Sequence, residues 1–270
     1  MPGHEPLSVS RAVAINVAAN SSLPGFRGPV YPDGRFEYVP IPEREPVPDG
    51  ATDGPWRGQR DRVPTYADLD LSFPAPTAVA DRAVHLDPAF AGVHGAPTTT
   101  YGDEHGVKAG PISTLEPGDH LLFYATLSLH PGPETVGDDP PEPAAFDREP
   151  APDLPPTWGA YLVGDLVVDR PFADPEPAAL TATERETVAG NAHLKRVDPE
   201  PAVLVAGDDD ASGLFDRAVP LSTPAAGTEA NDLVTALSND SGKGPWWRRV
   251  LRYDVDATDD LLAAVAAAQP

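Results

Sequence analysis

The sequence predicts a single α+β domain, built on a curved, mostly antiparallel sheet or a partly open barrel with several short helices around it. Two observations lead to this prediction. Short apolar runs typical of strands recur along the chain, with turn signals such as Pro-Gly and Asp-Gly between them. The helical patterns are few and short. The 270 residues can bury a core, and we expect one domain over residues 11–270 after a flexible tail at 1–10.

The first predicted strand is RAVAINVAAN, residues 11–20, where Val13 and Ile15 alternate with smaller side chains. The run RFEYVPI, residues 35–41, predicts a short strand at a sheet edge, because its proline cannot donate to a neighbouring strand. The apolar run AVLVAGD, residues 202–208, predicts a later strand.

A hairpin is predicted from two strands that flank a long insertion. In LEPGDHLLFYATL, one face of the strand is apolar and the other carries His120, Tyr124 and Thr126. This second face suits a pocket or a solvated surface equally well. A second strand follows at residues 161–168. Residues 131–156 between the two strands are acidic and proline-rich with little aliphatic mass, so we expect a disordered insertion at the tip of the hairpin.

Short helices are predicted from capping patterns. A threonine precedes an acidic residue by three positions at Thr65–Asp68 and at Thr181–Glu184 or Thr183–Glu186. The run NDLVTALSND predicts a further short helix. The tail TDDLLAAVAAAQP predicts a last helix, because Asp259 and Asp260 suit a helix N-terminus and alanine favours a helix interior.

The chain is strongly acidic, with a formal net charge of −23, and it contains only three lysines. Such a charge repels nucleic-acid phosphates in ordinary salt. The acids are spread along the whole chain and arginine replaces lysine, which is typical of proteins from a salt-saturated cytoplasm. Screening there removes most long-range repulsion. The net charge therefore does not exclude a nucleic-acid partner, and we expect the protein to need concentrated salt for stability.

Several classes of protein are excluded by what the sequence lacks. Without cysteine there are no disulfides, thiolate nucleophiles or cysteine-zinc sites. Phosphate-binding glycine loops and the G-x-S-x-G motif of hydrolases are also missing. No apolar run is long enough for a transmembrane helix and no signal-peptide pattern is present, so we expect a cytoplasmic protein with no membrane partner.

Polar side chains gather in several places that a core does not require. One group follows the first strand: Asn16, Asn20 and Arg27. A second group lies in a weakly patterned region: His85, Asp87, Tyr101, Asp103 and His105. Its side chains could ligate a cation, but the H-x-D spacing is common by chance, so we expect a surface loop and assign no metal ligand. Basic aromatic groups form two further clusters: Trp56 with Arg57, Arg60 and Arg62, and Trp246 and Trp247 with Arg248, Arg249 and Arg252.

The most unusual local chemistry is the run GNAHLKR. It places Asn191, His193, Lys195 and Arg196 close together in a chain that is rich in alanine and poor in lysine. Asparagine and histidine can read the edge of a base, and lysine and arginine can bind phosphate. A purely structural histidine is the alternative.

The hairpin sequence resembles that of PUA-like domains of the EVE and ASCH kind. There a strand of the type GDHLLFY pairs with one of the type YLVGDLVV, which ends near a turn matched here by Phe172, Asp174 and Pro175. The chain from residue 11 to about residue 222 resembles the nucleotide modification associated domain 3 family. The stretches that carry this resemblance are AVAINVAAN, LPGFRGPVYPDGRFEYVPIPE, VPTYADL, HLDPAF, TYGD, GDHLLFYATL, NAHLKR and LFDRAVPLS.

The two resemblances imply a PUA-like barrel and a role in a system that hypermodifies DNA bases, without assigning an activity. We therefore expect a component of such a system that binds a modified nucleotide or base, of DNA rather than RNA. The expected nucleotide-binding residues are Asn20, Arg27, Tyr101, Tyr124, Asn191, His193, Lys195 and Arg196.

Two alternatives stay open. The protein could be an enzyme acting on a base or a nucleotide precursor, with Asp87, Asp103 and His193 as acid-base or metal-binding groups. It could instead be a non-catalytic scaffold that binds protein partners in a modification complex. No cofactor is assigned by the sequence. If the polar residues meet in one cleft, two facing carboxylates there favour the enzyme, whereas aromatic residues with asparagine, lysine and arginine favour a protein that binds the base.

Overall fold

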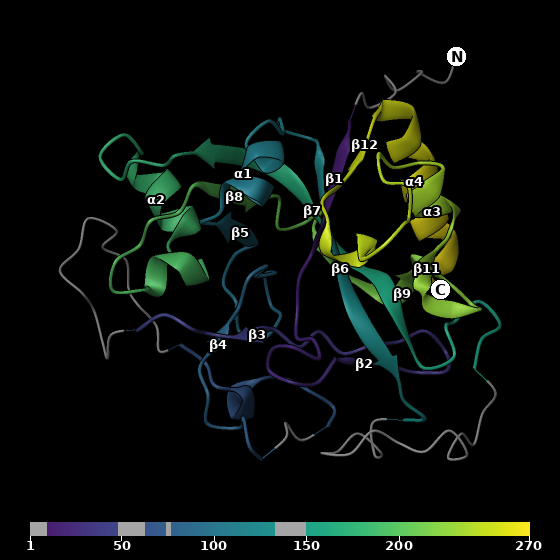
Figure 1. Ribbon diagram of the computed structural model, residues 1–270. Helices are drawn as coiled ribbons and strands as arrows, with labels where there is room; N and C mark the ends of the chain where they lie inside the picture. The colour runs from purple at the N-terminus through teal and green to yellow at the C-terminus, as the bar shows by residue number, and fades with distance from the viewer. Residues whose placement is uncertain (1–9, 48–62, 74–76, 133–149) are drawn as a thin grey trace.

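The computed structural model describes residues 10–47, 63–73, 77–132 and 150–270 (Figure 1). Three sequence predictions lie wholly or largely outside these residues. They are the flexible tail, the cluster of Trp56 with Arg57, Arg60 and Arg62, and the part of the acidic insertion from 133 to 149.

The central feature is a mixed sheet of eight strands with the order β12-β1-β6-β7-β8-β5, in which β2 also pairs with β6 and β9 with β7. The strands are β1 (Ala12–Asn16), β2 (Pro29–Val30), β5 (Thr100–Asp103), β6 (His120–Leu129), β7 (Trp158–Ala173), β8 (Val203–Gly207), β9 (Gly213–Pro220) and β12 (Leu251–Tyr253). Among the strands of this sheet that the structure describes, only the pairs β1–β6 and β2–β6 are parallel. The end strands β12 and β5 do not pair with each other, so the sheet is open among the described residues and a PUA-like barrel is not confirmed.

Strands β6 and β7 form the predicted antiparallel hairpin, and β6 lies in the middle of the sheet. Both faces of β6 are buried. Leu121 and Phe123 belong to the main core, whereas Leu122 and Tyr124 belong to a second core that includes Trp246. The expectation that one face of this strand is open is therefore wrong for most of its length. The reason is that the C-terminal segments, which include α4 (Val255–Ala268), cover the Tyr124 face.

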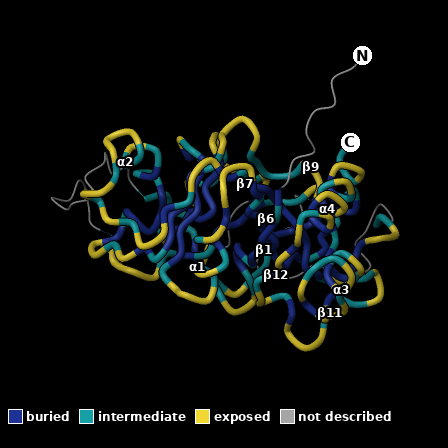
Figure 2. Tube along the Cα trace, turned by 90° about the horizontal axis from the view of Figure 1, so that it is seen from above, coloured by how far each residue is buried: buried dark blue, intermediate teal, exposed yellow. Residues whose placement is uncertain are grey.

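Strand β7 connects two parts of the molecule because it is long enough to pair with different strands at its two ends. Its first half pairs with β6 and β9, and its second half pairs with β8. The register shifts between Val168 and Arg170, where the strand passes from one set of partners to the next. In Figure 1, β5 and β8 lie to one side of this passage and β1, β12 and α4 lie to the other. Figure 2 shows buried segments of β1, β6 and β7 in the interior, with exposed segments around them.

The helices are short, and two of them begin where the capping patterns predict. The α-helices are α1 (Gly106–Ile112), α2 (Ala182–Val188), α3 (Asp232–Thr235) and α4, and 3-10 helices cover Tyr66–Asp68, Ala192–Lys195 and Trp246–Arg248. Capping boxes form at Thr65–Asp68 and Thr181–Glu184. Helix α4 begins at Val255 with Asp254 as its cap, earlier than predicted. No helix in the described ranges is long and apolar enough to span a membrane.

Two short two-stranded ladders lie outside the eight-stranded sheet. Strands β3 (Ile41–Pro42) and β4 (Val84–His85) form a two-stranded ladder, as do β10 (Ser222–Thr223) and β11 (Ala226–Ala230). The strand predicted over residues 35–41 is therefore reduced to its last residue and to an isolated bridge between Phe36 and Val30.

The last residues of the predicted insertion belong to the folded core. Leu154 is buried in the main core, and the backbone N–H of Ala151 donates to the carbonyl oxygen of Pro32 at 2.9 Å. The expectation that the whole of residues 131–156 lacks packed apolar groups is therefore wrong for this end. The segment is rich in proline and acidic residues overall, and this average composition gives no sign that the single residue Leu154 packs into the core.

Candidate functional site

A cleft of about 670 Å³ opens beside the central sheet, where segments from distant parts of the sequence meet. Its walls come from the loop after β1, from β3 and β4, from β5 and the start of α1, and from the 3-10 helix Ala192–Lys195. Histidine, carboxylate and arginine side chains line one end, and arginine and tryptophan side chains line the other. The volume lies within the range of typical small-molecule sites.

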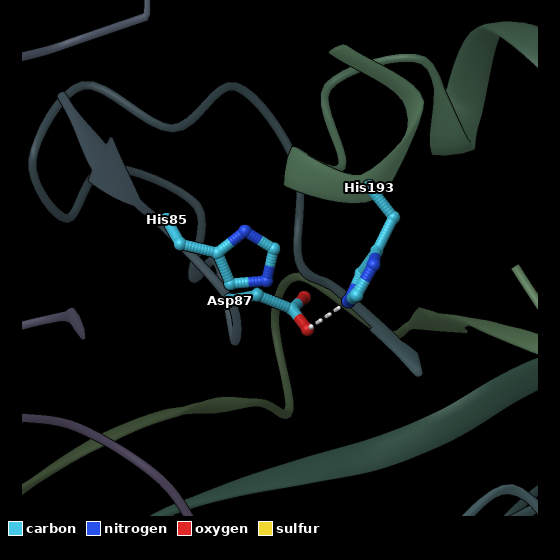
Figure 3. A group of neighbouring side chains, drawn as sticks. All are labelled: His85, Asp87 and His193. Atoms are coloured by element: carbon cyan, nitrogen blue, oxygen red, sulfur yellow. Dashed lines mark ion pairs between the residues drawn. The ribbon is translucent and has the colours of Figure 1, made fainter. Parts of the chain in front are cut away.

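At the polar end, His85, Asp87 and His193 form a buried cluster (Figure 3). His85 is the last residue of β4, and Asp87 follows two positions later. His193 lies on the 3-10 helix that Asn191 caps, because the Asn191 side chain accepts a hydrogen bond from the backbone N–H of His193. The two imidazole rings meet edge to face with centroids 4.6 Å apart, and Nε2 of His193 lies 3.4 Å from Oδ2 of Asp87.

The Asp87 carboxylate is held by donors from two other segments. The backbone N–H of Gly102 donates to it at 3.0 Å, and Nδ2 of Asn191 donates to Oδ1 at 2.9 Å. Position 102 requires glycine, since a Cβ atom there would lie 2.8 Å from both the Asn191 side-chain oxygen and the His193 ring. The close approach of β5 to the 3-10 helix therefore depends on a residue without a side chain.

Each histidine also contacts a carboxylate through its Nδ1 atom. Nδ1 of His85 lies 2.7 Å from Oε2 of Glu43, and Nδ1 of His193 lies 3.1 Å from Oε1 of Glu104. Arg196 links the two acids, because its guanidinium donates to Oε1 of Glu43 at 2.9 Å and also to Glu104. The result is a continuous buried network that connects loop, strand and 3-10 helix.

Contacts in the network shift the pKa values of Glu43, Glu104 and His193 toward their charged forms. Burial alone would raise the pKa of Glu43, but the hydrogen bond and charge of His85 lower it well below its ordinary value. The pKa of Glu104 is lowered in the same way, because the contacts with His193 and Arg196 outweigh burial. Burial would lower the pKa of His193, but the hydrogen bond and charge of Asp87 raise it above its ordinary value. His193 is therefore suited to carry a proton or another positive charge beside Asp87.

A second group of titratable side chains lies next to this cluster. The Tyr101 hydroxyl donates to Oδ2 of Asp103 at 3.2 Å, and the His105 backbone N–H donates to Oδ1 at 2.6 Å. Nζ of Lys108 donates to the carbonyl oxygen of Asn16 at 3.1 Å, and burial lowers the pKa of Lys108. Titratable groups with shifted pKa values in one cleft are typical of catalytic sites.

The other end of the cleft presents aromatic and basic groups. The guanidinium carbon of Arg27 lies 4.4 Å from the centroid of the Trp158 ring, and Trp158 meets Trp247 edge to face at 5.6 Å. Nε of Arg27 is buried and has no hydrogen-bond partner among the described residues. Arg248 also lines this end. These groups can stack on a planar ligand and bind an anion.

The family model for nucleotide modification associated domain 3 matches residues 11–266 of the chain. The chain belongs to this family. The description of nucleotide modification associated domain 3 connects it with nucleotide modification systems, and the matched residues include the whole cleft. No curated protein and no solved structure matches the chain.

Most of the site residues predicted from the sequence line the cleft of this member of the nucleotide modification associated domain 3 family. Those that do are Asn20, Arg27, Asp87, Tyr101, Asp103, His193 and Arg196. His85, Asn16 and His105 from the sequence clusters line it too. Residues 100–103 form buried strand β5 rather than the expected surface loop, because they pair with β8.

Three predicted nucleotide-binding residues do not line the cleft. Tyr124 is fully buried in the second core, and its hydroxyl donates to the carbonyl oxygen of Arg249 at 2.5 Å. Asn191 is fully buried behind Asp87. Lys195 is the last residue of the 3-10 helix and is not part of the cleft wall. These positions argue against direct base contacts by Tyr124 and Asn191.

Sequence reasoning overlooked several groups that line the cleft, which are Glu43, Glu104, Lys108 and Trp158. Lys108 carried a usable signal, because it is one of only three lysines in the chain. The scarcity of lysine marks Lys108 as strongly as it marks Lys195. Glu43 and Glu104 gave no signal, since glutamates are frequent in so acidic a sequence.

Proposed function

We propose that the protein is an enzyme of a nucleotide modification system, and that its cleft binds a nucleotide or a nucleotide unit of DNA and acts on the base. The observation that supports this proposal is the composition of the cleft. One end offers arginine and tryptophan, and the other offers histidines and carboxylates, among which His193, Glu43 and Glu104 have shifted pKa values. A nucleotide has an anionic part and a planar part that match such a cleft.

The arginine and tryptophan end supports nucleotide binding. Trp158 and Trp247 present indole rings on which a base can stack, and Arg27 has a buried donor that a phosphate or a base oxygen could accept from. Arg248 adds a second positive charge at the same end. Local basic groups matter here because they act at contact distance, whereas the net negative charge of the chain acts at long range and is screened by salt.

The histidine and carboxylate end supports catalysis over simple recognition. Reading a base needs a few donors and acceptors, but this end also contains a His–Asp pair, a Tyr–Asp pair and Lys108, whose pKa is lowered by burial. Such groups can transfer protons to and from a base, an effect worth about 10²–10⁴-fold in rate. A protein that only binds modified bases is the second candidate, and the arginine and tryptophan end supports it equally.

The binding part of the proposal is tested by replacing Trp247 with alanine. Stacking of one base on an aromatic ring contributes about 1–3 kcal/mol, so Trp247→Ala should weaken nucleotide binding by about 10-fold or more. The measurement is calorimetric titration in molar KCl with nucleoside monophosphates and short oligonucleotides. Trp247 is half-buried, so thermal melting checks that the variant is folded.

The control is Trp247→Phe, which keeps an aromatic ring and should retain most of the affinity. If the alanine and wild-type proteins bind equally well, the cleft is not where the nucleotide binds. If wild-type protein binds no nucleotide of either kind, the proposed function is wrong and a scaffold role becomes the better account.

A further inference from the structure

We propose that His85, Asp87 and His193 form a three-ligand site for a divalent first-row transition metal ion. The ligands would be the Nε2 atoms of both histidines and the Asp87 carboxylate. The inference deepens the proposed function, and its catalytic meaning rests on that function, because the bound ion would face the same cleft as the nucleotide. Ion binding itself depends only on the three side chains and their neighbours.

The three side chains lie near the spacing that one ion requires. One ligand atom from each lies within 4.8 Å of the other two, and all three residues are buried. Ligand atoms bound to one ion at about 2.1 Å are separated by about 3–4 Å. Nε2 of His193 and Oδ2 of Asp87 are already 3.4 Å apart. Figure 3 shows both imidazole rings turned toward the Asp87 carboxylate.

The hydrogen bonds of the two histidines direct their Nε2 atoms toward this common point. Nδ1 of His85 is closer to Glu43, at 2.7 Å, than to Arg196, at 3.4 Å. Nδ1 of His193 is closer to Glu104, at 3.1 Å, than to Arg196, at 3.3 Å. An ionised carboxylate can only accept, so each Nδ1 carries a hydrogen, and Nε2 is the nitrogen that can bind an ion once any proton on it has been released. A carboxylate behind each histidine is the usual arrangement around a protein-bound metal.

The Asp87 carboxylate is positioned by its own set of donors. Oδ1 accepts from Asn191 at 2.9 Å and from the Gly102 backbone N–H at 3.0 Å, and these bonds fix the plane of the group. Oδ2 faces the Nε2 atom of His193. The short distance between Nε2 and Oδ2 favours a positive charge between them, which a proton on Nε2 or a metal ion can supply.

The donor set selects the class of ion. Two imidazole nitrogens and one carboxylate suit Mn²⁺, Fe²⁺, Co²⁺ or Zn²⁺, whereas Mg²⁺ and Ca²⁺ prefer oxygen ligands alone. Three protein ligands leave coordination positions open, as in catalytic rather than structural sites. His85, Asp87 and His193 all line the cleft, so these positions would be open to a bound substrate or water.

The test is titration of chelator-treated protein in molar KCl with Mn²⁺, Fe²⁺ (without oxygen), Co²⁺ and Zn²⁺, by calorimetry and thermal melting. One ion per chain should bind, and the melting temperature should rise with ion concentration. Asp87→Asn and His193→Gln should abolish stoichiometric binding. Glu104→Gln, which removes the negative charge that faces both His193 and Arg196, should weaken binding by about 10–100-fold.

The matched control is His120→Gln. His120 pairs through Nδ1 with Asp165 at 2.7 Å, outside the cleft, so this variant should bind the ion as wild type does. If Asp87→Asn fails to fold, X-ray absorption of the wild-type protein with Co²⁺ should still show two imidazole ligands. The proposal is overturned if none of the four ions binds stoichiometrically, if binding survives both ligand variants, or if absorption shows no imidazole.

The metal site and the proposed function can fail separately. Ion binding is measured without any nucleotide, and nucleotide binding by the tryptophan end is measured in the presence of a chelator. If the protein binds an ion but no nucleotide, the metal site is supported and the proposed function is wrong. Nucleotide binding without any ion binding overturns the metal site alone.

Discussion

Replacing Arg196 with methionine should lower the free energy of unfolding by about 3–5 kcal/mol, the cost of removing one partner from a buried ion pair. Arg196 is the only side chain seen to bridge Glu43 and Glu104 among the described residues. The Glu43 side chain is 3% exposed, so its charge cannot turn to water when the guanidinium is lost. Urea unfolding at neutral pH and constant KCl concentration measures the effect.

The loss should depend on pH in a defined direction. The pKa values of Glu43 and Glu104 are lower in the folded protein than their ordinary value of 4.5. Groups of this kind stabilise the fold above their unfolded pKa, and the contribution is lost as the pH falls through the folded pKa. The difference between wild type and Arg196→Met should therefore be full at pH 7 and shrink below about pH 4.5.

Arg170→Met is the control for this experiment. Arg170 pairs with Glu184, but its side chain is 58% exposed, and surface pairs contribute about 0–1 kcal/mol. Equal effects of the two substitutions would contradict the description of the Arg196 network as buried and structurally coupled.

Replacing Asn191 with alanine should lower the free energy of unfolding by about 2–4 kcal/mol and weaken ion binding as well. The Asn191 side chain is fully buried, donates to Asp87 and to Thr100, and accepts from the His193 backbone N–H. Without it, a buried carboxylate loses a donor and a backbone N–H loses its acceptor, and each such loss costs about 1–3 kcal/mol.

Asn231→Ala is a close match for this substitution. Asn231 also caps a short helix, accepts from the backbone N–H two positions on, at Leu233, and donates through Nδ2 to the carbonyl oxygen of Pro220. It contacts no carboxylate in these bonds, so we expect only the loss of a helix cap, about 1 kcal/mol. If Asn191→Ala were no more costly than Asn231→Ala, the support of Asp87 by Asn191 would be negligible.

The parts of the fold with regular patterns could be predicted from the sequence. The β6–β7 hairpin has alternating apolar residues, and α2 has a capping box at Thr181 and Glu184 that the structure confirms. Helix α1 was not found, because Gly106, Gly110 and Pro111 give it a low intrinsic helix propensity. Strand β5 was not found because the letters TYGD do not predict a strand; pairing with β8 makes it one.

The composition of the site could be predicted only in pieces. Asp87 and Asn191 are 104 positions apart, so no local spacing indicates that they meet. The GNAHLKR run is unusual in composition, but its residues separate in the structure. His193 and Arg196 line the cleft, whereas Asn191 supports Asp87 from behind. The direction in which each side chain points depends on the 3-10 helix, which a seven-residue pattern does not specify.

The central claim is that the His–Asp cluster acts on a nucleotide base. The most direct test is mass spectrometry of nucleosides from cells that carry the wild-type gene, Asp87→Asn or the control His120→Gln, with equal amounts of folded protein. The account predicts that at least one modified nucleoside changes in abundance with Asp87→Asn and not with His120→Gln. Identical nucleoside profiles in all three strains would contradict it.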